Sequence, residues 1–353
     1  MASAQTPDKR LQPATALWKR YDPASAPLAF RATTVPAARA WQTKVRRELS
    51  AALGFQDTPA VAFRPRGVER VDKGDYIREK YYISVAPDSV MPFYLLTPKG
   101  VANPATVIAL HGHGYGVKDI VGLRADGTDR DAPEGYHKDF GVALCRSGFV
   151  VAAPEISCFG ERQNNYEHLK AYGSPVPPTC AQTAALAAHL GGTAAGLRVL
   201  EARRLVDYLA SRGDIDTVRL GAMGISGGGL HTFYSAILDT RIRACVVSGY
   251  FCTFEHSILA MHHCACNFVP GLGRFGEMAD LAACIAPRPM LVEAASRDTI
   301  FPLHAVKKSV AQARRNCAVF GMEKPIETDY FEGEHEISGR KAYAFLRKHL
   351  SAE

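Results

Sequence analysis

Ser226 has the surroundings that point most directly to chemistry, because it stands among five glycines in GAMGISGGGL, residues 221–230. Glycine costs up to ~1 kcal/mol per helix position relative to alanine, so an ordinary helix does not favour this composition. A G-x-S-x-G pattern between a strand and a helix holds the serine at the apex of a sharp turn with its hydroxyl exposed. The pattern predicts a nucleophile; the alternative is a glycine-rich turn whose serine only caps the helix. The pattern has no role for Gly229.

A serine nucleophile needs a base and an acid that orients the base. His335, in FEGEHEIS, follows the last predicted strand, and Asp298, in EAASRDTIFP, follows the predicted strand before it. We therefore predict His335 as the general base and Asp298 as its partner, in the chain order Ser…Asp…His. The alternative is that His335 is an ordinary surface-loop histidine and Asp298 an ordinary turn aspartate. Glu255 and Glu293 are rival acids, which we rank below Asp298.

The HGHG segment, residues 111–114, follows a strand-like run and is suited to hold the oxyanion. We predict that the N–H groups of Gly227 and His113 form the oxyanion hole, with Gly114 as the fallback for the second donor. One such donor can be worth ~3 kcal/mol of barrier. The two histidines form no convincing metal pair, and we expect His111 to bond the loop to the backbone.

Residues that follow predicted strand ends are candidates for substrate binding. Glu161 and Arg162, in CFGER, have a simpler interpretation as an ion pair that anchors the 160–192 segment. The candidates are Tyr115, Phe159, Glu161, Arg162, Phe251 and His263.

The elements that must position these residues follow from the pattern of apolar runs. Aromatic and β-branched stretches predict antiparallel strands at 65–72, 76–84 and 92–97. Short, fully apolar runs predict buried parallel strands at 105–110, 149–154, 218–224, 244–249, 289–295 and 326–331. Helical patterns fall at 36–53, 138–147, 195–212, 227–238, 276–285, 303–316 and 338–350. Repeated βα units predict an α/β fold with a mostly parallel sheet flanked by helices.

Two connections, 115–137 and 160–192, are too long for simple βα loops and are expected to lie over the strand ends where ligands bind. We expect residues 1–60 to be an N-terminal extension with one amphipathic helix packed on the main domain, residues 61–353.

Taken together, HGHG, GISGGG, a late aspartate and a late histidine resemble the α/β-hydrolase superfamily. FGER (159–162), RLGAMGISGGGLHT (219–232), LDTRIRACVVSGY (238–250), HHCACNFVPG (262–271) and IAPRPMLVEAASRDTIFP (285–302) resemble its dienelactone-hydrolase-like and acetyl-xylan-esterase-like branch. The resemblance covers residues 60–350. It implies a serine esterase with Ser226, Asp298 and His335 as triad, acting on a short acyl group carried by a polar or sugar-like alcohol.

Two further motifs suggest cofactors but lack the context these require. GLGRFG, residues 271–276, has no apolar strand before it, which a dinucleotide-binding turn needs. HHCAC, residues 262–266, lacks a clear second pair of metal ligands. We therefore expect neither a metal nor a cofactor.

Composition narrows the remaining classes. The net charge of +7 comes from scattered basic residues, so we expect no nucleic-acid partner. No apolar run approaches the ~18 residues that span a membrane, and the first residues lack the apolar core of a signal peptide. Nine cysteines without a CxxC pair are typical of buried reduced thiols. We expect a cytoplasmic protein with a small-molecule ester substrate; the sequence predicts no oligomeric state.

Other functions stay open on the same residues. An amidase or peptidase, or a hydrolase of lactones or carbon–carbon bonds, would use the same triad. A binding protein on an inactive hydrolase scaffold is the alternative from another class, and covalent labelling of Ser226 separates it from an enzyme.

Overall fold

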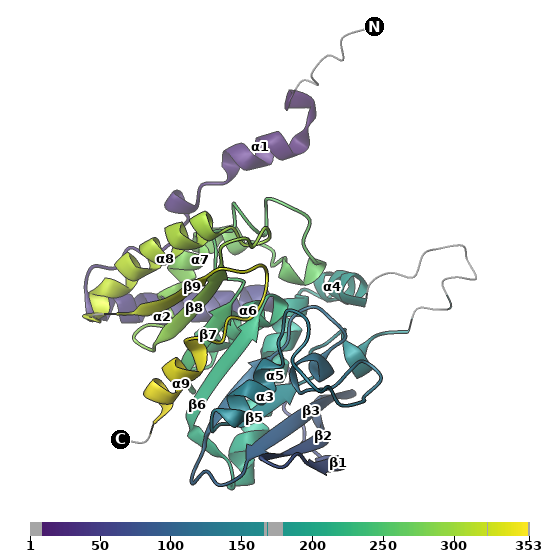
Figure 1. Cartoon of the computed structure of the whole chain (residues 1–353). Helices are drawn as coiled ribbons and strands as arrows, with labels where there is room; N and C mark the ends of the chain where they lie inside the picture. The colour runs from purple at the N-terminus through teal and green to yellow at the C-terminus, as the bar shows by residue number, and fades with distance from the viewer. Residues whose placement is uncertain (1–8, 166–167, 169–178, 323, 352–353) are drawn as a thin grey trace, which may run out of the picture.

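The computed structural model of the chain describes residues 9–165, 168, 179–322 and 324–351. At its centre is a nine-stranded sheet in the order β1-β2-β3-β5-β4-β6-β7-β8-β9 (Figure 1). The strands are β1 (Arg66–Asp72), β2 (Tyr76–Ala86), β3 (Ser89–Pro98), β4 (Ala105–Leu110), β5 (Val150–Pro154), β6 (Asp216–Ile225), β7 (Ile242–Ser248), β8 (Met290–Ala295) and β9 (Ile326–Phe331).

The sheet has an antiparallel end and a parallel body. β1, β2 and β3 pair antiparallel in sequence, and β3 is antiparallel to β5. From β5 through β9 every neighbouring pair is parallel. This arrangement confirms the predicted α/β-hydrolase fold with an antiparallel edge. It also brings the carboxyl ends of the parallel strands to one edge, where loops meet to form a site.

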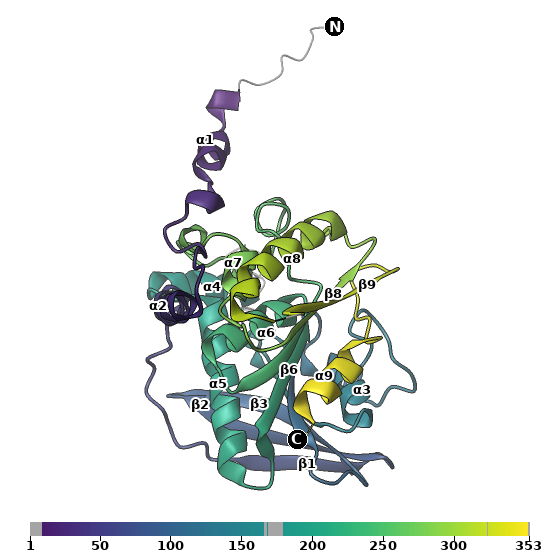
Figure 2. The ribbon, with the colours of Figure 1, turned by 90° about the vertical axis from the view of Figure 1, so that its left-hand side faces the viewer.

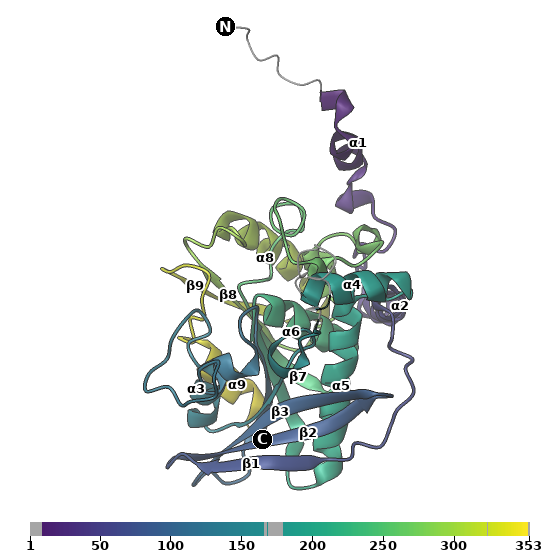
Figure 3. The same ribbon diagram turned by 90° about the vertical axis from the view of Figure 1, so that its right-hand side faces the viewer.

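Helices cover both faces of the sheet. In Figures 2 and 3, α3 and α9 lie on one face, and α2, α5 and α6 lie on the other. The helices are α1 (Pro13–Arg20), α2 (Val35–Leu53), α3 (Phe140–Arg146), α4 (Thr179–His189), α5 (Ala194–Arg212), α6 (Gly227–Leu238), α7 (Met278–Ala282), α8 (Leu303–Cys317) and α9 (Ala342–Leu350). None of these described helices combines the length and apolar character that a membrane crossing requires.

Alternation along the strands divides the core into two layers. In β4, Val107 and Ala109 belong to the layer that contains Phe140 and Phe345, while Ile108 and Leu110 belong to the layer on the other face. Successive side chains of a strand point to opposite faces, so a strand covered on both sides must be apolar throughout. This explains why the parallel strands are continuous apolar runs in the sequence.

The N-terminal segment contains one helix more than predicted. α2 packs through Ala38, Gln42, Val45, Leu49 and Leu53, which recur at helical spacing. α1 has no buried residue and projects away from the body of the protein (Figure 1). The boundary at residue 60 between this segment and the main domain stays a prediction.

Three other elements differ from the predictions. α7 is shorter than the predicted helix at 276–285 and covers only Met278–Ala282. α4 lies within 160–192, which we expected to be a loop; its run of alanines favours a helix, and residues 166–167 and 169–178 lie outside the described residues. α9 begins at Ala342 and not at residue 338. Gly339 has a φ of 67°, a left-handed conformation that cannot continue a helix, so the chain turns there first.

Candidate active site

Ser226 occupies a strained turn between β6 and α6. Its backbone has φ 57° and ψ −121°, a conformation that costs of order 1–3 kcal/mol for a residue with a Cβ atom. The turn is held by two hydrogen bonds: Ser226 N–H donates to the Ser248 carbonyl at 3.0 Å, and the Ser226 carbonyl accepts from Leu230 N–H at 2.9 Å. The serine therefore stands at the helix N-terminus in the geometry of a nucleophile elbow.

The glycines after Ser226 are required by close packing of α6 against the sheet. A Cβ atom on Gly228 would lie 1.9 Å from the Leu110 carbonyl oxygen. A Cβ atom on Gly229 would lie 2.7 Å from Tyr250 Cβ and 2.8 Å from the Ser248 carbonyl oxygen. Gly229, which has no role in the sequence pattern, is thus needed for α6 to pass the end of β7.

Asp298 and His335 form a hydrogen-bonded pair. His335 Nδ1 lies 2.7 Å from Asp298 Oδ2. The other carboxylate oxygen accepts from the N–H groups of Ile300 at 2.8 Å and Phe301 at 3.0 Å. Because both oxygens are engaged, the carboxylate has a fixed orientation and holds the proton of the imidazole on Nδ1, which leaves Nε2 as the basic nitrogen.

His335 and Ser226 line the same cavity. His335 Nε2 is buried and forms no hydrogen bond to any described residue, the Ser226 hydroxyl included. The ring contacts those of Tyr136 and Phe301, with centroids 5.5 and 5.7 Å away. The cavity has a volume of about 300 Å³, and its walls include Gly227, His113 and His263.

The predicted oxyanion residues lie beside the nucleophile. Gly227 is the first residue of α6, so its N–H has no acceptor within the helix. The His113 ring lies against it: a Cβ atom on Gly227 would be 3.0 Å from His113 Nδ1. A Cβ atom on Gly114, the fallback donor, would lie 2.8 Å from Asp119 Oδ2. The roles of Gly227, His113 and Gly114 as oxyanion donors stay predictions.

Comparison with known families agrees with this architecture. A sequence model of the Abhydrolase family matches residues 19–329. The chain belongs to the Abhydrolase family.

A curated relative of this family member is YtaP from Bacillus subtilis (strain 168). It is 26% identical over 261 residues, which cover 69% of this chain and 79% of YtaP.

Solved structures share the fold at low sequence identity. One is titled a "putative acetyl xylan esterase" (BF1801) from Bacteroides fragilis NCTC 9343; it has a TM-score of 0.74 and 16% identity and covers 94% of this chain and 84% of its own. Another is a glucuronoyl esterase from Solibacter usitatus, with a TM-score of 0.64 and 17% identity, covering 93% of this chain and 97% of its own. These similarities establish the α/β-hydrolase fold.

In this Abhydrolase family member a second His–Asp pair supports the HGHG loop. Gly112 N–H donates to His137 Nε2 at 2.8 Å, and His137 Nδ1 lies 2.8 Å from Asp119 Oδ2. The Tyr136 hydroxyl donates to the His113 carbonyl. Sequence reasoning missed these residues, because it treated 115–137 only as a loop over the site. A histidine and an aspartate within a segment that follows HGHG were the available signal.

Burial fixes the chemical state of this support. It lowers the pKa of His137, so the ring is neutral and accepts the Gly112 N–H on Nε2. Burial also raises the pKa of Tyr136, which keeps the phenol protonated as a donor. His111 holds the same loop from the other side, with Nδ1 2.8 Å from the Gly112 carbonyl and Nε2 accepting from Ile156 N–H at 3.0 Å. This is the backbone-bonding role predicted for His111.

Two of the six substrate-binding candidates line the hollow beside Ser226. His263 lies in the wall of the smaller cavity and in the wall of a neighbouring one of about 850 Å³. Phe159 lines the larger cavity, and its ring lies 5.2 Å from that of His113. Both are placed to contact a substrate, and their role stays a prediction.

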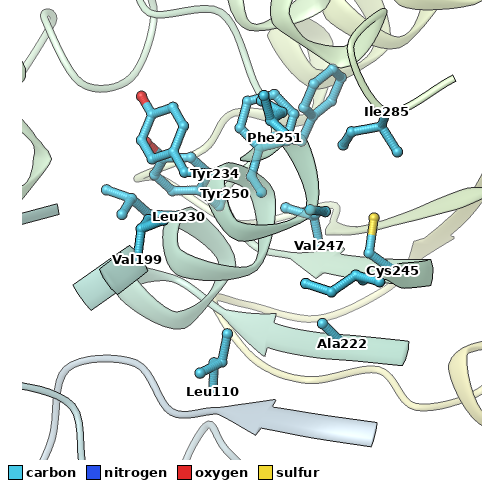
Figure 4. Close-up of a cluster of buried hydrophobic side chains, with 14 of the residues drawn as sticks. Leu110, Val199, Ala222, Leu230, Tyr234, Cys245, Val247, Tyr250, Phe251 and Ile285 are labelled. Atoms are coloured by element: carbon cyan, nitrogen blue, oxygen red, sulfur yellow. The ribbon is translucent and has the colours of Figure 1, made fainter. Parts of the chain in front are cut away.

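Tyr115 and Phe251 are engaged away from these cavities. The Tyr115 hydroxyl donates to the Leu123 carbonyl at 2.8 Å. Phe251 is 1% exposed and belongs to the core beside α6 (Figure 4). Position after a strand end placed both near the edge of the sheet, but packing turns their side chains away from the site.

Glu161 and Arg162 are held by other charged groups. Glu161 pairs with Lys80 and accepts from the Tyr82 hydroxyl on β2. Arg162 lies 2.7 Å from Glu201 on α5. The simpler interpretation, an anchor for the segment after β5, fits these contacts, although each residue pairs with a separate partner and not with the other.

The rival acids are not partners of His335 in the structure. Glu255 lies 3.5 Å from His256 and 3.7 Å from Lys308. Glu293 is 1% exposed, and its Oε1 accepts from Gly339 N–H at 3.0 Å. Burial raises the pKa of Glu293 to about 7, so this carboxyl ties the C-terminal loop to the sheet partly in its protonated form.

The structure also assembles a group of metal-ligating side chains. His113, Cys180, Cys264 and Cys266 each present one ligand atom, and these atoms all lie within 4.8 Å of one another. The neighbouring Cys180 and Cys264 side chains hold the pKa of Cys266 well below its ordinary value. The sequence did not indicate this group, because His113 and Cys180 come from two segments remote from HHCAC.

Proposed function

We propose that the protein is a serine hydrolase of carboxylic esters, with Ser226 as nucleophile, His335 as general base and Asp298 as the acid that orients it. One observation carries the proposal. A serine in a strained elbow and an imidazole whose Nδ1 is held by a carboxylate line the same cavity, and Nε2 of that imidazole has no hydrogen-bond partner among the described residues.

The first half-reaction forms an acyl-enzyme. The Ser226 hydroxyl rotates toward His335 Nε2 and gives up its proton as Oγ attacks the acyl carbon. Asp298 stabilises the imidazolium that forms. The N–H groups of Gly227 and His113 bind the oxyanion, and each is expected to contribute ~3 kcal/mol to barrier lowering. His335 then protonates the leaving alcohol.

The second half-reaction restores the enzyme. Water enters the cavity, His335 Nε2 takes its proton, and the hydroxide attacks the acyl carbon. Collapse of the second tetrahedral intermediate releases the acid and returns the proton to Ser226. In this mechanism every proton passes through His335 Nε2, which has no partner within the described part of the chain.

We propose a short acyl group on a polar or sugar-like alcohol as the substrate class. The cavity next to Ser226, about 300 Å³, suits a small acyl group. The larger neighbouring cavity carries polar side chains, among them Gln163, His262 and His263, which suit hydroxyl groups of the alcohol. The names of the structural neighbours, acetyl xylan esterase and glucuronoyl esterase, support esters of carbohydrates.

The test compares wild type and Ser226→Ala on a chromogenic acetyl ester and on the matched anilide. We expect hydrolysis of the ester by wild type, and a loss of kcat of about 10⁴-fold or more in the variant. Equal turnover of ester and anilide would favour an amidase. Retained ester turnover in Ser226→Ala would show that another group performs the reaction.

A further inference from the structure

Three cysteines and one histidine converge at the rim of the candidate active site from three separate parts of the chain. His113 follows β4, Cys180 is the second residue of α4, and Cys264 and Cys266 lie in the segment after β7. His113 Nε2 is 3.6 Å from Cys266 Sγ, and the four ligand atoms all lie within 4.8 Å of one another. None of the nine cysteines forms a disulfide.

This ligand set has the composition and nearly the size of a tetrahedral zinc site. Zn–S bonds of ~2.3 Å and Zn–N bonds of ~2.0 Å require ligand atoms separated by roughly 3.3–3.8 Å. The His113–Cys266 contact already has this length, and a separation of 4.8 Å would close by roughly 1 Å on binding. Three thiolates and one imidazole leave no open coordination position, which is typical of structural and not catalytic zinc.

A buried arginine supplies the charge that such a site needs nearby. Arg198 is 1% exposed, and its Nη2 donates to Cys180 Sγ at 3.3 Å and to the Ser157 carbonyl at 3.1 Å. Within the part of the chain that the structure describes, Arg198 forms no ion pair with a carboxylate, so it is available as the counter-charge of metal-bound thiolates. Zn²⁺ with three thiolates has a net charge of about −1, which one guanidinium balances.

We propose that His113, Cys180, Cys264 and Cys266 bind one structural Zn²⁺. The metal joins three segments that are far apart in the sequence, and it holds the His113 ring through Nε2. The other side of that ring lies against Gly227, next to Ser226. By fixing the imidazole, the metal also fixes the backbone of His113. This consequence for turnover rests on the proposed esterase function, whereas metal binding does not.

The experiment uses the full chain, purified under reducing conditions from zinc-supplemented cells. We expect about one zinc per chain by elemental analysis. After zinc is removed, titration with Co²⁺ should give thiolate-to-cobalt charge-transfer bands and intense visible bands of tetrahedral cobalt. Cys266→Ser and Cys180→Ser should lower metal affinity by about 100-fold or more, a larger loss than a supporting residue gives. Cys317→Ser, which replaces a buried cysteine of α8, should leave affinity unchanged.

Three results would overturn the proposal. The first is wild-type protein that carries no zinc and gives no tetrahedral cobalt spectrum. The second is octahedral cobalt bands, and the third is a disulfide among these cysteines that persists after purification under reducing conditions and prevents metal binding. Because the cobalt titration uses wild type, failure of a variant to fold leaves the test decisive.

The second part of the experiment measures turnover with and without zinc. We expect removal of zinc to lower kcat on the acetyl ester by about 10-fold to 100-fold, with recovery when zinc is returned. If zinc binds and its removal leaves kcat unchanged, the metal does not position His113. If zinc binds and wild type hydrolyses no ester, the proposed function fails while the metal site stands.

Discussion

The structure contains two His–Asp pairs whose imidazole rings both contact Tyr136, and they differ in the partner of one ring nitrogen. Nδ1 of His335 is 2.7 Å from Asp298, and Nδ1 of His137 is 2.8 Å from Asp119. Nε2 of His137 accepts a hydrogen bond from the Gly112 backbone, whereas Nε2 of His335 has no partner among the described residues. The same dyad therefore serves as a candidate base in one place and as a support in the other.

The difference shows that a histidine–aspartate pair alone does not identify a general base. An imidazole can move a proton only when its second nitrogen reaches the reacting group. In His137 that nitrogen already accepts a hydrogen bond from Gly112, in the loop that carries His113. A variant at each pair should consequently affect turnover by different amounts and for different reasons.

The largest effect on turnover is expected from a variant of His335. His335→Ala removes the proposed base, so kcat on an acetyl ester should fall by about 10⁴-fold to 10⁶-fold, measured by steady-state kinetics. Its thermal unfolding should change little, because the ring is partly exposed and its Nε2 supports no backbone. A loss below 10-fold would contradict the role of His335.

The next largest effect on turnover is expected from a variant of Asp298, with Asp119 as its matched control. Asp298→Asn should lower kcat by about 10³-fold to 10⁴-fold, because the amide can hold the wrong tautomer of His335 and cannot stabilise its cation. Asp119→Asn is the matched control at the other pair, and its kcat should stay within about 10-fold of wild type, since no imidazolium forms there. Equal losses in the two variants would remove the distinction between the pairs.

A smaller effect on turnover is expected from variants of His137, which supports the HGHG loop. His137→Ala leaves the Gly112 N–H buried without an acceptor, which should cost about 1–3 kcal/mol in the free energy of unfolding. We expect kcat to fall by about 10-fold to 100-fold as the HGHG loop loosens, with KM nearly unchanged. His137→Gln, whose amide oxygen can accept the same hydrogen bond, should recover part of both losses. A loss as large as that of His335→Ala would make His137 a candidate base.

The smallest effect concerns pH and the loop that carries His335. Burial raises the pKa of Glu293 from 4.5 to about 7, so the folded state holds this proton more tightly than the unfolded state. The resulting stability is fully present below pH 4.5 and is lost as pH rises through 7. Glu293→Gln should therefore unfold with a free energy less dependent on pH between 5 and 8, by at most about 3 kcal/mol. An unchanged slope in chemical denaturation would contradict this ionisation.

The sequence predicted the features that local patterns determine. Buried strands are apolar throughout, and a serine elbow needs glycines around it, so the nine strands and the turn at Ser226 were readable. Asp298 and His335 were also predicted from the strand pattern, because each lies in the loop after a strand whose carboxyl end is at the same edge of the sheet as Ser226. The structure brings these two together and leaves the Ser226–His335 contact to be formed.

The features that the sequence did not predict depend on contacts between distant segments. Gly229 is explained by Tyr250, His137 by Gly112, and Cys180 by the cysteines after β7; each pair meets only in the folded chain. Four substrate-binding candidates failed to reach the cavities for the same reason. A position just after a strand end places the backbone near the site, but packing decides where the side chain points.

The central claim is that His335 activates Ser226. It is tested most directly by the rate at which a fluorophosphonate labels the protein, with the labelled residue mapped by mass spectrometry, in wild type, His335→Ala and His137→Ala. We predict labelling of wild type at Ser226 alone, a rate at least about 10³-fold lower in His335→Ala, and a much smaller decrease in His137→Ala. Labelling at another residue, or a wild-type rate in His335→Ala, would contradict it.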